Sequence, residues 1–230
     1  MRAAAPSRAG LYGCGRLADL DGAPLRPGGL ALTEELIGLA GFRPGDHVAD
    51  VGCGLGGSTR LLNERGVLAV GVDIDVEARA DGGASALVAA DAARLPFADG
   101  RLDGVLAECV LSVLTDRSAA LAEWARVLRA GGRLALSDVY IRAGAGTARI
   151  GTRESLAGAV EAAGLRVERF EDRSDALKRW VAEFIFGYGS LDALCGGRGG
   201  MDAALSASRP GYCLIVARKP DAQSEDALHG

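Results

Sequence analysis

The sequence predicts an α/β fold built on a parallel, doubly wound sheet. Short apolar segments of strand character alternate five times with segments of helical periodicity, the pattern typical of strands joined by crossover helices. The second of these strands reads VLAVGVD and is nearly continuous in hydrophobicity, as strands buried on both faces are. The first strand runs into a glycine-rich turn, and such sheets bind ligands at the carboxyl ends of their strands.

The elements follow from periodicity and from turn residues. The first helix is expected to be capped by Thr33 and to end at Gly41, and Gly131 and Gly132 are expected to stop the third helix. Strands are predicted at 47–51, 67–73, 86–90, 102–107, 133–138, 165–170 and 212–217, and later helices from about 58, at 118–129, 153–163 and 175–187. We therefore divide the chain into an N-terminal tail that is a linker or a lid (1–29), one domain (30–219) and a disordered tail (220–230).

Composition indicates a soluble protein that handles small molecules. The 230 residues are 49% hydrophobic and 24% charged, with a net charge of −4, which does not favour a nucleic-acid partner. No apolar run approaches the roughly 20 residues that span a bilayer, and the first ten residues lack the apolar region of a signal peptide. The five cysteines form no C-x-x-C pair. We expect a cytoplasmic protein without membrane partner, disulfide framework or metal; its oligomeric state is left open.

The turn after the first strand is typical of a loop that holds a nucleotide-containing cofactor. Glycines occupy alternate positions 52, 54 and 56, and glycine allows tight turns and close approach of a ligand to the backbone. The amides that open the next helix carry a partial positive charge toward such a ligand. Asp73 ends the second strand 19 residues after Gly54, the spacing at which a carboxylate accepts hydrogen bonds from ribose hydroxyls.

Two nucleotide cofactors fit that spacing, NAD and S-adenosylmethionine. Asp50 precedes the glycines, where a carboxylate reaches the ammonium group of an amino-acid tail but repels a pyrophosphate. Asp91 follows the third strand, placed to accept a hydrogen bond from an adenine amino group. The chain also continues past its fifth strand with helix, strand, helix and strand, rather than with a substrate domain. These features favour S-adenosylmethionine.

Five segments of the chain are, in order, VADVGCGLGG, GVDID, DAARLPF, LDGVLAECVL and WARVLRAGGRLALSDVY. Together these segments resemble a class I S-adenosylmethionine-dependent methyltransferase of the UbiE-like, methyltransferase type 11 group. The resemblance implies a Rossmann-like, mostly parallel seven-stranded sheet with an antiparallel last strand, and S-adenosylhomocysteine as product. The cofactor-binding residues that it implies are Asp50, Gly52, Cys53, Gly54 and Gly56 at the methionine end, Asp73 at the ribose, Ile74, Asp91 and Ala92 at the adenine, and Glu108 facing the cofactor.

Methyl transfer from a sulfonium is an in-line displacement, so the protein mainly aligns the nucleophile and excludes water. A general base assists when the acceptor is protonated. The candidates are Glu108, Asp138 and Tyr140 at strand ends and Tyr12 from the N-terminal segment. The methyl acceptor, a small molecule, is not identified by these residues.

Other readings stay open. Cys14, Cys109 and Cys195 could converge as soft thiolate ligands, which would favour methylation of a metalloid such as arsenite. Alternatively, each is a packing or incidental cysteine. A non-catalytic protein that keeps the cofactor site, or an NAD-dependent oxidoreductase, is a further alternative.

Overall fold

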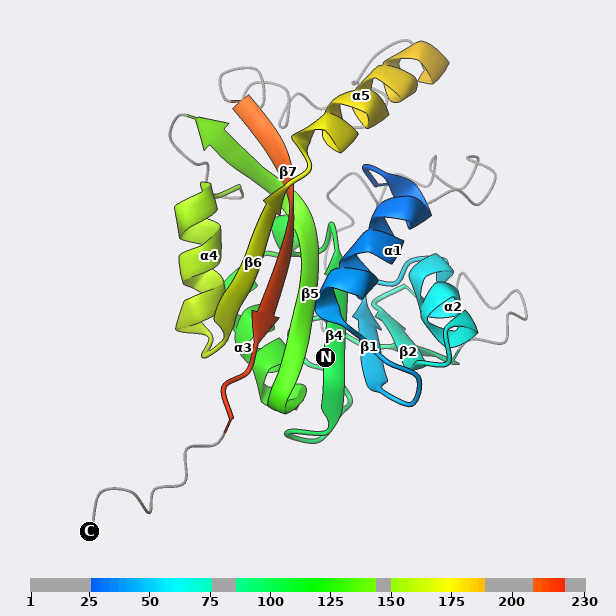
Figure 1. Cartoon of the computed structure of the whole chain (residues 1–230), viewed down its shortest axis with the longest axis vertical. Helices are drawn as coiled ribbons and strands as arrows, with labels where there is room; N and C mark the ends of the chain where they lie inside the picture. The colour runs from blue at the N-terminus through cyan, green and yellow to red at the C-terminus, as the bar shows by residue number, and fades with distance from the viewer. Residues whose placement is uncertain (1–25, 76–85, 144–149, 189–208, 222–230) are drawn as a thin grey trace, which may run out of the picture.

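The computed structural model describes residues 26–75, 86–143, 150–188 and 209–221. Its centre is a seven-stranded sheet in the order β3-β2-β1-β4-β5-β7-β6 (Figure 1). The strands are β1 (His47–Val51), β2 (Leu68–Asp73), β3 (Ala86–Ala89), β4 (Leu102–Glu108), β5 (Leu128–Ala143), β6 (Arg166–Asp172) and β7 (Arg209–Arg218). Strands β1 to β5 pair in parallel, which confirms the predicted doubly wound sheet.

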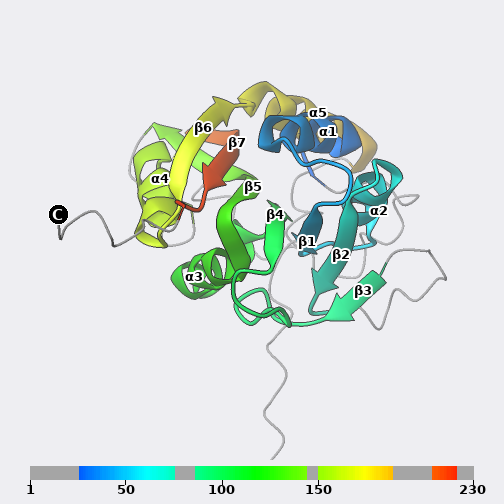
Figure 2. The same ribbon diagram turned by 60° about the horizontal axis from the view of Figure 1, so that its bottom comes forward.

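Helices cover both faces of this sheet. Helices α1 (Gly29–Ala40), α2 (Gly57–Glu64) and α5 (Ser174–Tyr188) contact one face, and α3 (Arg117–Val127) and α4 (Arg153–Ala162) contact the other. Figure 2 shows the two groups on opposite sides of the twisted strands. A short 3-10 helix at Leu111–Val113 joins β4 to α3. The glycine-rich loop therefore lies where β1 meets α2, at the carboxyl edge of the sheet.

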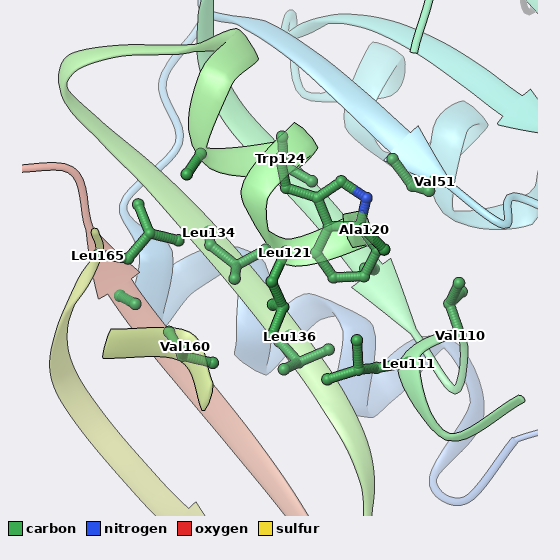
Figure 3. Packing of buried hydrophobic residues seen from close by; sticks show 14 of the residues in the cluster. Val51, Val110, Leu111, Ala120, Leu121, Trp124, Leu134, Leu136, Val160 and Leu165 are labelled. Atoms are coloured by element: carbon green, nitrogen blue, oxygen red, sulfur yellow. The ribbon is translucent and has the colours of Figure 1, made fainter. Parts of the chain in front are cut away.

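The larger part of the core lies between the sheet and α3. The Trp124 side chain is fully buried there, beside Leu121 of the same helix and Val51 of β1 (Figure 3). A second buried cluster lies under α1 and contains Leu36, Leu106 and Tyr212. Burying each of these large apolar side chains contributes roughly 1.5–3 kcal/mol, so the two clusters fix the strand ends that form the site.

Strand β7 lies between β5 and β6 and is antiparallel to both. The antiparallel last strand, which the family resemblance implies, is thereby confirmed. This arrangement has a consequence for the site, because it brings Tyr212 from late in the chain into the sheet, opposite Val139 of β5.

Two local predictions were wrong. Thr33 does not cap α1, because the helix already begins at Gly29, after Gly28 in a left-handed conformation (φ 76°). The hydroxyl of Thr33 instead lies within hydrogen-bond distance of two acceptors, Glu108 Oε1 at 3.0 Å and Gly29 O at 3.2 Å, and donates to one of them at a time. Gly131 and Gly132 do not stop α3 either: the helix ends at Val127 because Leu128 is already extended and paired with Leu102.

The other helix and strand boundaries agree with the prediction to within a few residues, apart from β5, which is longer at both ends. The proposed tail or lid is described only from Arg26 onward, and most of the C-terminal tail also lies outside the described residues. Among the helices of the described segments, none combines the length and the apolar character needed to cross a membrane.

Candidate functional site

The loop after β1 is held against the neighbouring strand by its own backbone. The amides of Gly52 and Cys53 both donate to the carbonyl of Val72, at 2.7 and 3.2 Å. Gly52, Gly54 and Gly56 have φ of 69°, 58° and 75°, a region that L-residues rarely adopt. A Cβ at residue 52 would also lie 2.3 Å from a methyl of Val110, so only glycine fits there. The loop is thus a rigid turn with exposed backbone at the sheet edge.

Asp73 is tied to this loop. One of its carboxylate oxygens accepts a hydrogen bond from Gly54 N at 3.0 Å, and the other accepts from Asp75 N at 3.0 Å. The carboxylate therefore lies beside the glycines, as its spacing in the sequence suggested, and two backbone amides fix its direction. A carboxylate accepts up to about four hydrogen bonds, so this one can serve the loop and a ligand's hydroxyls together.

The residues expected near an adenine lie on adjacent strand ends. Ile74 follows β2 and is 64% exposed, which is unusual for isoleucine and leaves an apolar face at the rim. Asp91 follows β3 and is exposed, with one oxygen accepting from Ala93 N at 2.8 Å. The carbonyl of Ala92 accepts from the indole of Trp124 at 2.9 Å. Because β2 and β3 are neighbours, these residues and Asp73 share one edge of the sheet.

Asp50 lies below the loop and is 2% exposed. Its carboxyl accepts a hydrogen bond from the hydroxyl of Thr59, at 2.6 Å, from the first turns of α2. Burial raises the pKa of Asp50 to about 7, with a further contribution from the negative charge of Glu108; the Thr59 hydrogen bond and the charge of Arg26 act in the opposite direction. Near neutral pH this group consequently exists in both protonation states.

Glu108 ends β4 and forms a buried polar cluster with residues of three other segments. Arg26 Nη2 lies 2.9 Å from Glu108 Oε2, and the two side chains are 14% and 5% exposed. Ser58 Oγ donates to Glu108 Oε2 at 2.8 Å, and Thr33 Oγ1 donates to Oε1 at 3.0 Å. We call Arg26, Thr33, Ser58 and Glu108 the Arg26 cluster. It brings the start of α1, the first turn of α2 and the end of β4 together beside the glycines.

Sequence reasoning found Glu108 but missed the other three members of the Arg26 cluster. The sequence places Arg26 in the N-terminal segment 1–29, outside the predicted domain. It indicates a capping role for Thr33 and marks Ser58 only as the start of a helix. No spacing rule connects position 26 with position 108. One available signal was the arginine directly before the Pro-Gly-Gly turn that opens α1.

Beyond Glu108 the chain takes an unusual turn. Cys109 has φ 56° and is the one non-glycine residue with positive φ in the described part of the chain. Its sulfur lies 3.1 Å from the hydroxyl of Tyr212, which donates to Ser137 Oγ at 2.9 Å. Burial raises the pKa of Cys109 to about 12, so the thiol is neutral at physiological pH. A neutral, hydrogen-bonded thiol is a poor metalloid ligand.

The remaining candidates are placed away from the loop or outside the described residues. Asp138 is 1% exposed and accepts hydrogen bonds from Ser112 N at 2.9 Å and Val139 N at 2.7 Å, which brace the connection from β4 to α3. Tyr140 is 5% exposed and packs edge-to-face on Phe170, with ring centroids 5.4 Å apart. Tyr12, Cys14 and Cys195 lie outside the described residues. Within the described ranges, no group of three His, Cys, Asp or Glu could hold a metal ion.

Comparison with known proteins adds a family to this geometry. The sequence profile of a family described as "Methyltransferase domain" matches residues 49–136, the segment from β1 into β5. A demethylmenaquinone methyltransferase of Mycolicibacterium paratuberculosis is 43% identical over 100 residues, which cover 43% of this chain and 44% of the relative. The chain thus spans a little under half the length of the curated relatives that it matches first.

Solved structures match over more of the chain. A phosphoethanolamine N-methyltransferase of Haemonchus contortus in complex with S-adenosyl-L-methionine has a TM-score of 0.71 at 17% identity, covering 87% of this chain and 55% of that one. The [4+2]-cyclase SpnF has a TM-score of 0.67 at 24% identity, covering 83% and 80%. At these identities the likeness concerns the fold, and proteins with different reactions share it.

Proposed function

We propose that the chain is a class I S-adenosylmethionine-dependent methyltransferase of the UbiE-like group and that it transfers the methyl group of S-adenosylmethionine to a small-molecule acceptor; the matched methyltransferase-domain profile and the relatives named above support this proposal. The observation that carries this proposal is the position of Asp73, whose carboxylate lies on the glycine loop 3.0 Å from Gly54 N. A ribose held there would place the amino-acid end of the cofactor over Gly52 and Gly54, and its adenine toward Ile74.

The residues present fit this cofactor. The left-handed glycines expose backbone that a bulkier residue would cover, and Ile74 offers an exposed apolar face for a base. The Arg26 cluster adds one cation and one carboxylate beside the loop. We assign Gly52, Cys53, Gly54 and Gly56 to the methionine end, Asp73 to the ribose, and Ile74 with Asp91 and Ala92 to the adenine. Asp50 supports the loop through Thr59 from below.

When bound, S-adenosylmethionine supplies a methyl group on a positively charged sulfur, which is an activated leaving group. In such a transfer the acceptor's lone pair would form the new bond to the methyl carbon, the carbon–sulfur bond would break, and its electron pair would stay on the sulfur. The chain contributes by aligning the two reactants, since alignment can account for about 7–11 kcal/mol of a barrier. Glu108 adds a negative charge near the developing site, although hydroxyls and Arg26 already engage both of its oxygens.

The acceptor's proton is a separate question. Asp138 and Tyr140 are engaged in structural contacts, and Glu108 is paired with Arg26. Because these three candidates among the described residues are engaged, we propose an acceptor that loses its proton readily, as a phenol or an enol does, for which a strong base is not required. A cavity of about 510 Å³ between the starts of α1 and α5 is large enough for a small molecule. Its lining is largely charged and includes Glu35, Arg142, Asp172 and Lys178, which suits a polar acceptor.

Calorimetric titration tests the cofactor assignment. The wild-type protein is expected to bind S-adenosylhomocysteine with a Kd in the micromolar range and to show no comparable affinity for NADH. Asp73→Ala is expected to weaken S-adenosylhomocysteine binding by about 10- to 100-fold, because a charge-assisted hydrogen bond contributes about 1.5–3 kcal/mol. Asp221→Asn, an exposed carboxylate paired with Arg218 at the opposite edge, serves as the matched control and should leave binding unchanged.

Tight binding of NADH in place of S-adenosylhomocysteine would overturn the assignment. Transfer itself is measured with labelled S-adenosylmethionine and a panel of polar phenols and enols, to which demethylmenaquinone is added because of the relative named above. Labelled methyl in a product identifies a methyltransferase. Cofactor binding without transfer to any member of the panel would instead favour a protein that uses the site for another purpose.

A further inference from the structure

The Arg26–Glu108 pair is the least exposed ion pair in the described part of the chain, with side chains 14% and 5% exposed. An isolated pair in such a position contributes little to stability, because removing both charges from water costs as much as their attraction returns. Because the pair lies next to the glycine-rich loop, its position suggests a role in ligand binding rather than in stability. Ala107 pairs with Val51 in the sheet, so Glu108 lies level with Gly52, the first glycine of the loop.

Arg26 is incompletely satisfied by the protein. Its Nη2 atom carries two hydrogens, but three acceptors surround it: Thr33 Oγ1, Ser58 Oγ at 2.7 Å and Glu108 Oε2 at 2.9 Å. In contrast, Nε is buried and has no hydrogen-bond partner, the one such buried side-chain nitrogen or oxygen among the described residues. An unpaired buried donor costs about 1–3 kcal/mol, and a guanidinium presents Nε and Nη in the geometry that a carboxylate accepts.

We propose that Arg26 and Glu108 together form a receptor for the two charges at the amino-acid end of the cofactor: Arg26 for its carboxylate and Glu108 for its ammonium. The proposal rests on the proposed function. In the cofactor-free protein the two side chains neutralise each other, and the arriving zwitterion replaces that contact with one contact to each. The ammonium and the carboxylate bring one charge of each sign to the Arg26–Glu108 pair, and Nε of Arg26 gains an acceptor.

This assignment changes the role expected of Asp50. Its carboxyl is 2% exposed and accepts the Thr59 hydroxyl at 2.6 Å, so it supports α2 from below the loop. The Glu108 carboxylate lies instead at the carboxyl end of β4, beside Ser58 of the first helical turn after the loop. Glu108 is therefore the carboxylate that meets the ammonium group, and Ser58 and Thr33 hold it in position.

The experiment measures which charge each residue recognises. Four ligands share the thioadenosine part: S-adenosylhomocysteine, its analogue without the ammonium, its analogue without the carboxylate, and 5′-methylthioadenosine, which has neither. Kd values are determined by calorimetry for the wild type, Arg26→Gln and Glu108→Gln. Arg126→Gln is the matched control, because Arg126 also pairs with a glutamate, Glu123, but lies on α3, away from the glycine loop and from the cavity.

The wild type is expected to prefer S-adenosylhomocysteine at least 10-fold over either single-charge analogue. Arg26→Gln should abolish the preference over the ligand without carboxylate, and Glu108→Gln the preference over the ligand without ammonium. Binding of 5′-methylthioadenosine should stay within about twofold in both variants, which also shows that they are folded. The Arg126→Gln control should keep every ratio of the wild type.

Unchanged ligand ratios in Arg26→Gln and Glu108→Gln would overturn the receptor, as would an equal loss for all four ligands in correctly folded protein. These results differ from a failure of the proposed function. In that case the wild type itself binds neither S-adenosylhomocysteine nor 5′-methylthioadenosine. An increase in affinity for all four ligands in Arg26→Gln would show a plug that blocks the site, and would likewise contradict the receptor.

Discussion

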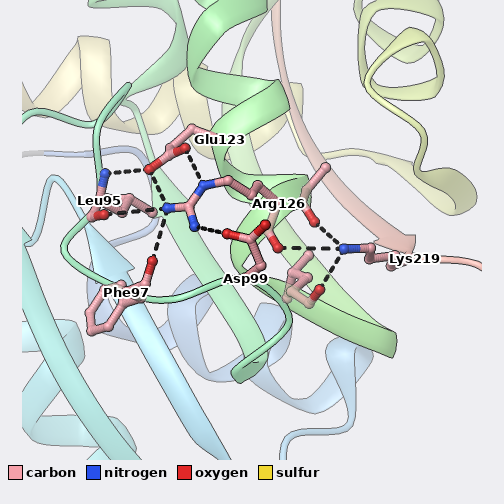
Figure 4. A network of polar contacts seen from close by, with 8 residues as sticks. Leu95, Phe97, Asp99, Glu123, Arg126 and Lys219 are labelled. Carbon is pink, nitrogen blue, oxygen red and sulfur yellow. Dashed lines mark hydrogen bonds and ion pairs between the residues drawn. The ribbon is translucent and has the colours of Figure 1, made fainter.

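Two arginine–carboxylate clusters in this molecule look similar in composition and differ in how well their hydrogen bonds are satisfied. One is the Arg26 cluster beside the glycine loop. The other, which we call the loop clamp, joins Arg126 and Glu123 of α3 to Asp99 and to the backbone of Leu95 and Phe97 (Figure 4). In the loop clamp, all three guanidinium nitrogens have partners, and Glu123 also accepts from Leu95 N at 2.7 Å.

The difference separates a structural role from a binding role. The loop clamp fixes the segment between β3 and β4 onto α3, and its arginine has an acceptor in every direction. Within the Arg26 cluster, three acceptors crowd one nitrogen while a buried N–H lacks any partner. An arginine whose donors all have acceptors within the protein is consistent with a structural role. A buried donor without an acceptor is consistent with a position at which a ligand supplies the missing acceptor.

The largest expected effect comes from breaking the Arg26 cluster on one side. Glu108→Ala leaves the charge of Arg26 buried and uncompensated, so the free energy of unfolding of the cofactor-free protein should fall by about 3–5 kcal/mol. The double variant Arg26→Met/Glu108→Leu should recover most of that stability without recovering affinity for S-adenosylhomocysteine. Urea unfolding measures the stability of both variants, and calorimetry measures their affinity. A Glu108→Ala variant as stable as the wild type would show that the pair is not buried in solution.

The second effect is a difference in pH dependence between the two clusters. The pKa of Asp50, beside the Arg26 cluster, is raised by burial to about 7, from about 4 in an unfolded chain. The folded protein therefore binds the extra proton between these values, and stability falls as pH rises from about 4 to 7, by at most about 4 kcal/mol. Asp50→Asn should remove this slope in urea unfolding; an unchanged slope would assign it to other groups.

The loop clamp should respond in the opposite sense. Hydrogen bonds from Arg126 lower the pKa of Glu123, so its contribution to stability is present above the unfolded pKa of about 4.3 and is lost as pH falls through the lower folded value. Arg126→Met should reduce stability at pH 7 by about 1 kcal/mol, because the arginine is partly solvated. It should leave the Kd for S-adenosylhomocysteine unchanged, and a tenfold loss of affinity would remove the distinction between the clusters.

The smallest effect concerns Lys219, which extends the polar contacts around α3. Its ammonium donates to the carbonyls of Ala125 and Leu128, both at 2.7 Å, and so satisfies the C-terminal end of the helix (Figure 4). Lys219→Met is expected to lower stability by about 0.5–1 kcal/mol, with no effect on ligand binding. Thermal unfolding of Lys219→Met and Arg126→Met in parallel compares the loss of stability in the two variants. A larger loss in Lys219→Met than in Arg126→Met would contradict this order.

The elements of the fold could be predicted from the sequence because their signals are local. Alternation of apolar segments gave the strands, and Gly41 marked the end of α1 as expected. The wrong end predicted for α3 has a non-local cause: Leu128 enters a strand at once because it pairs with Leu102, a partner that periodicity does not reveal.

The candidate site was predictable only in part. Asp50 and Asp73 could be identified because each stands at a fixed distance from the glycines along the chain. Arg26 could not, since its contact with Glu108 joins segments 82 residues apart and depends on how α1 lies over the sheet. Asp138 and Glu108 were indistinguishable as strand-end acids in the sequence; the backbone amides around Asp138 separate them.

The place of β7 between β5 and β6 also affects how the protein is made. Strand β6 pairs with β7, and α5 packs on β7 as well, so these elements lack their central neighbour until Arg209–Arg218 has been synthesised. During translation, β1 to β5 can assemble first, with one side of β5 exposed to unwanted strand pairing. Arrival of β7 closes that edge and delivers the phenol of Tyr212 beneath α1, so completion of the sheet and completion of the site coincide on the ribosome.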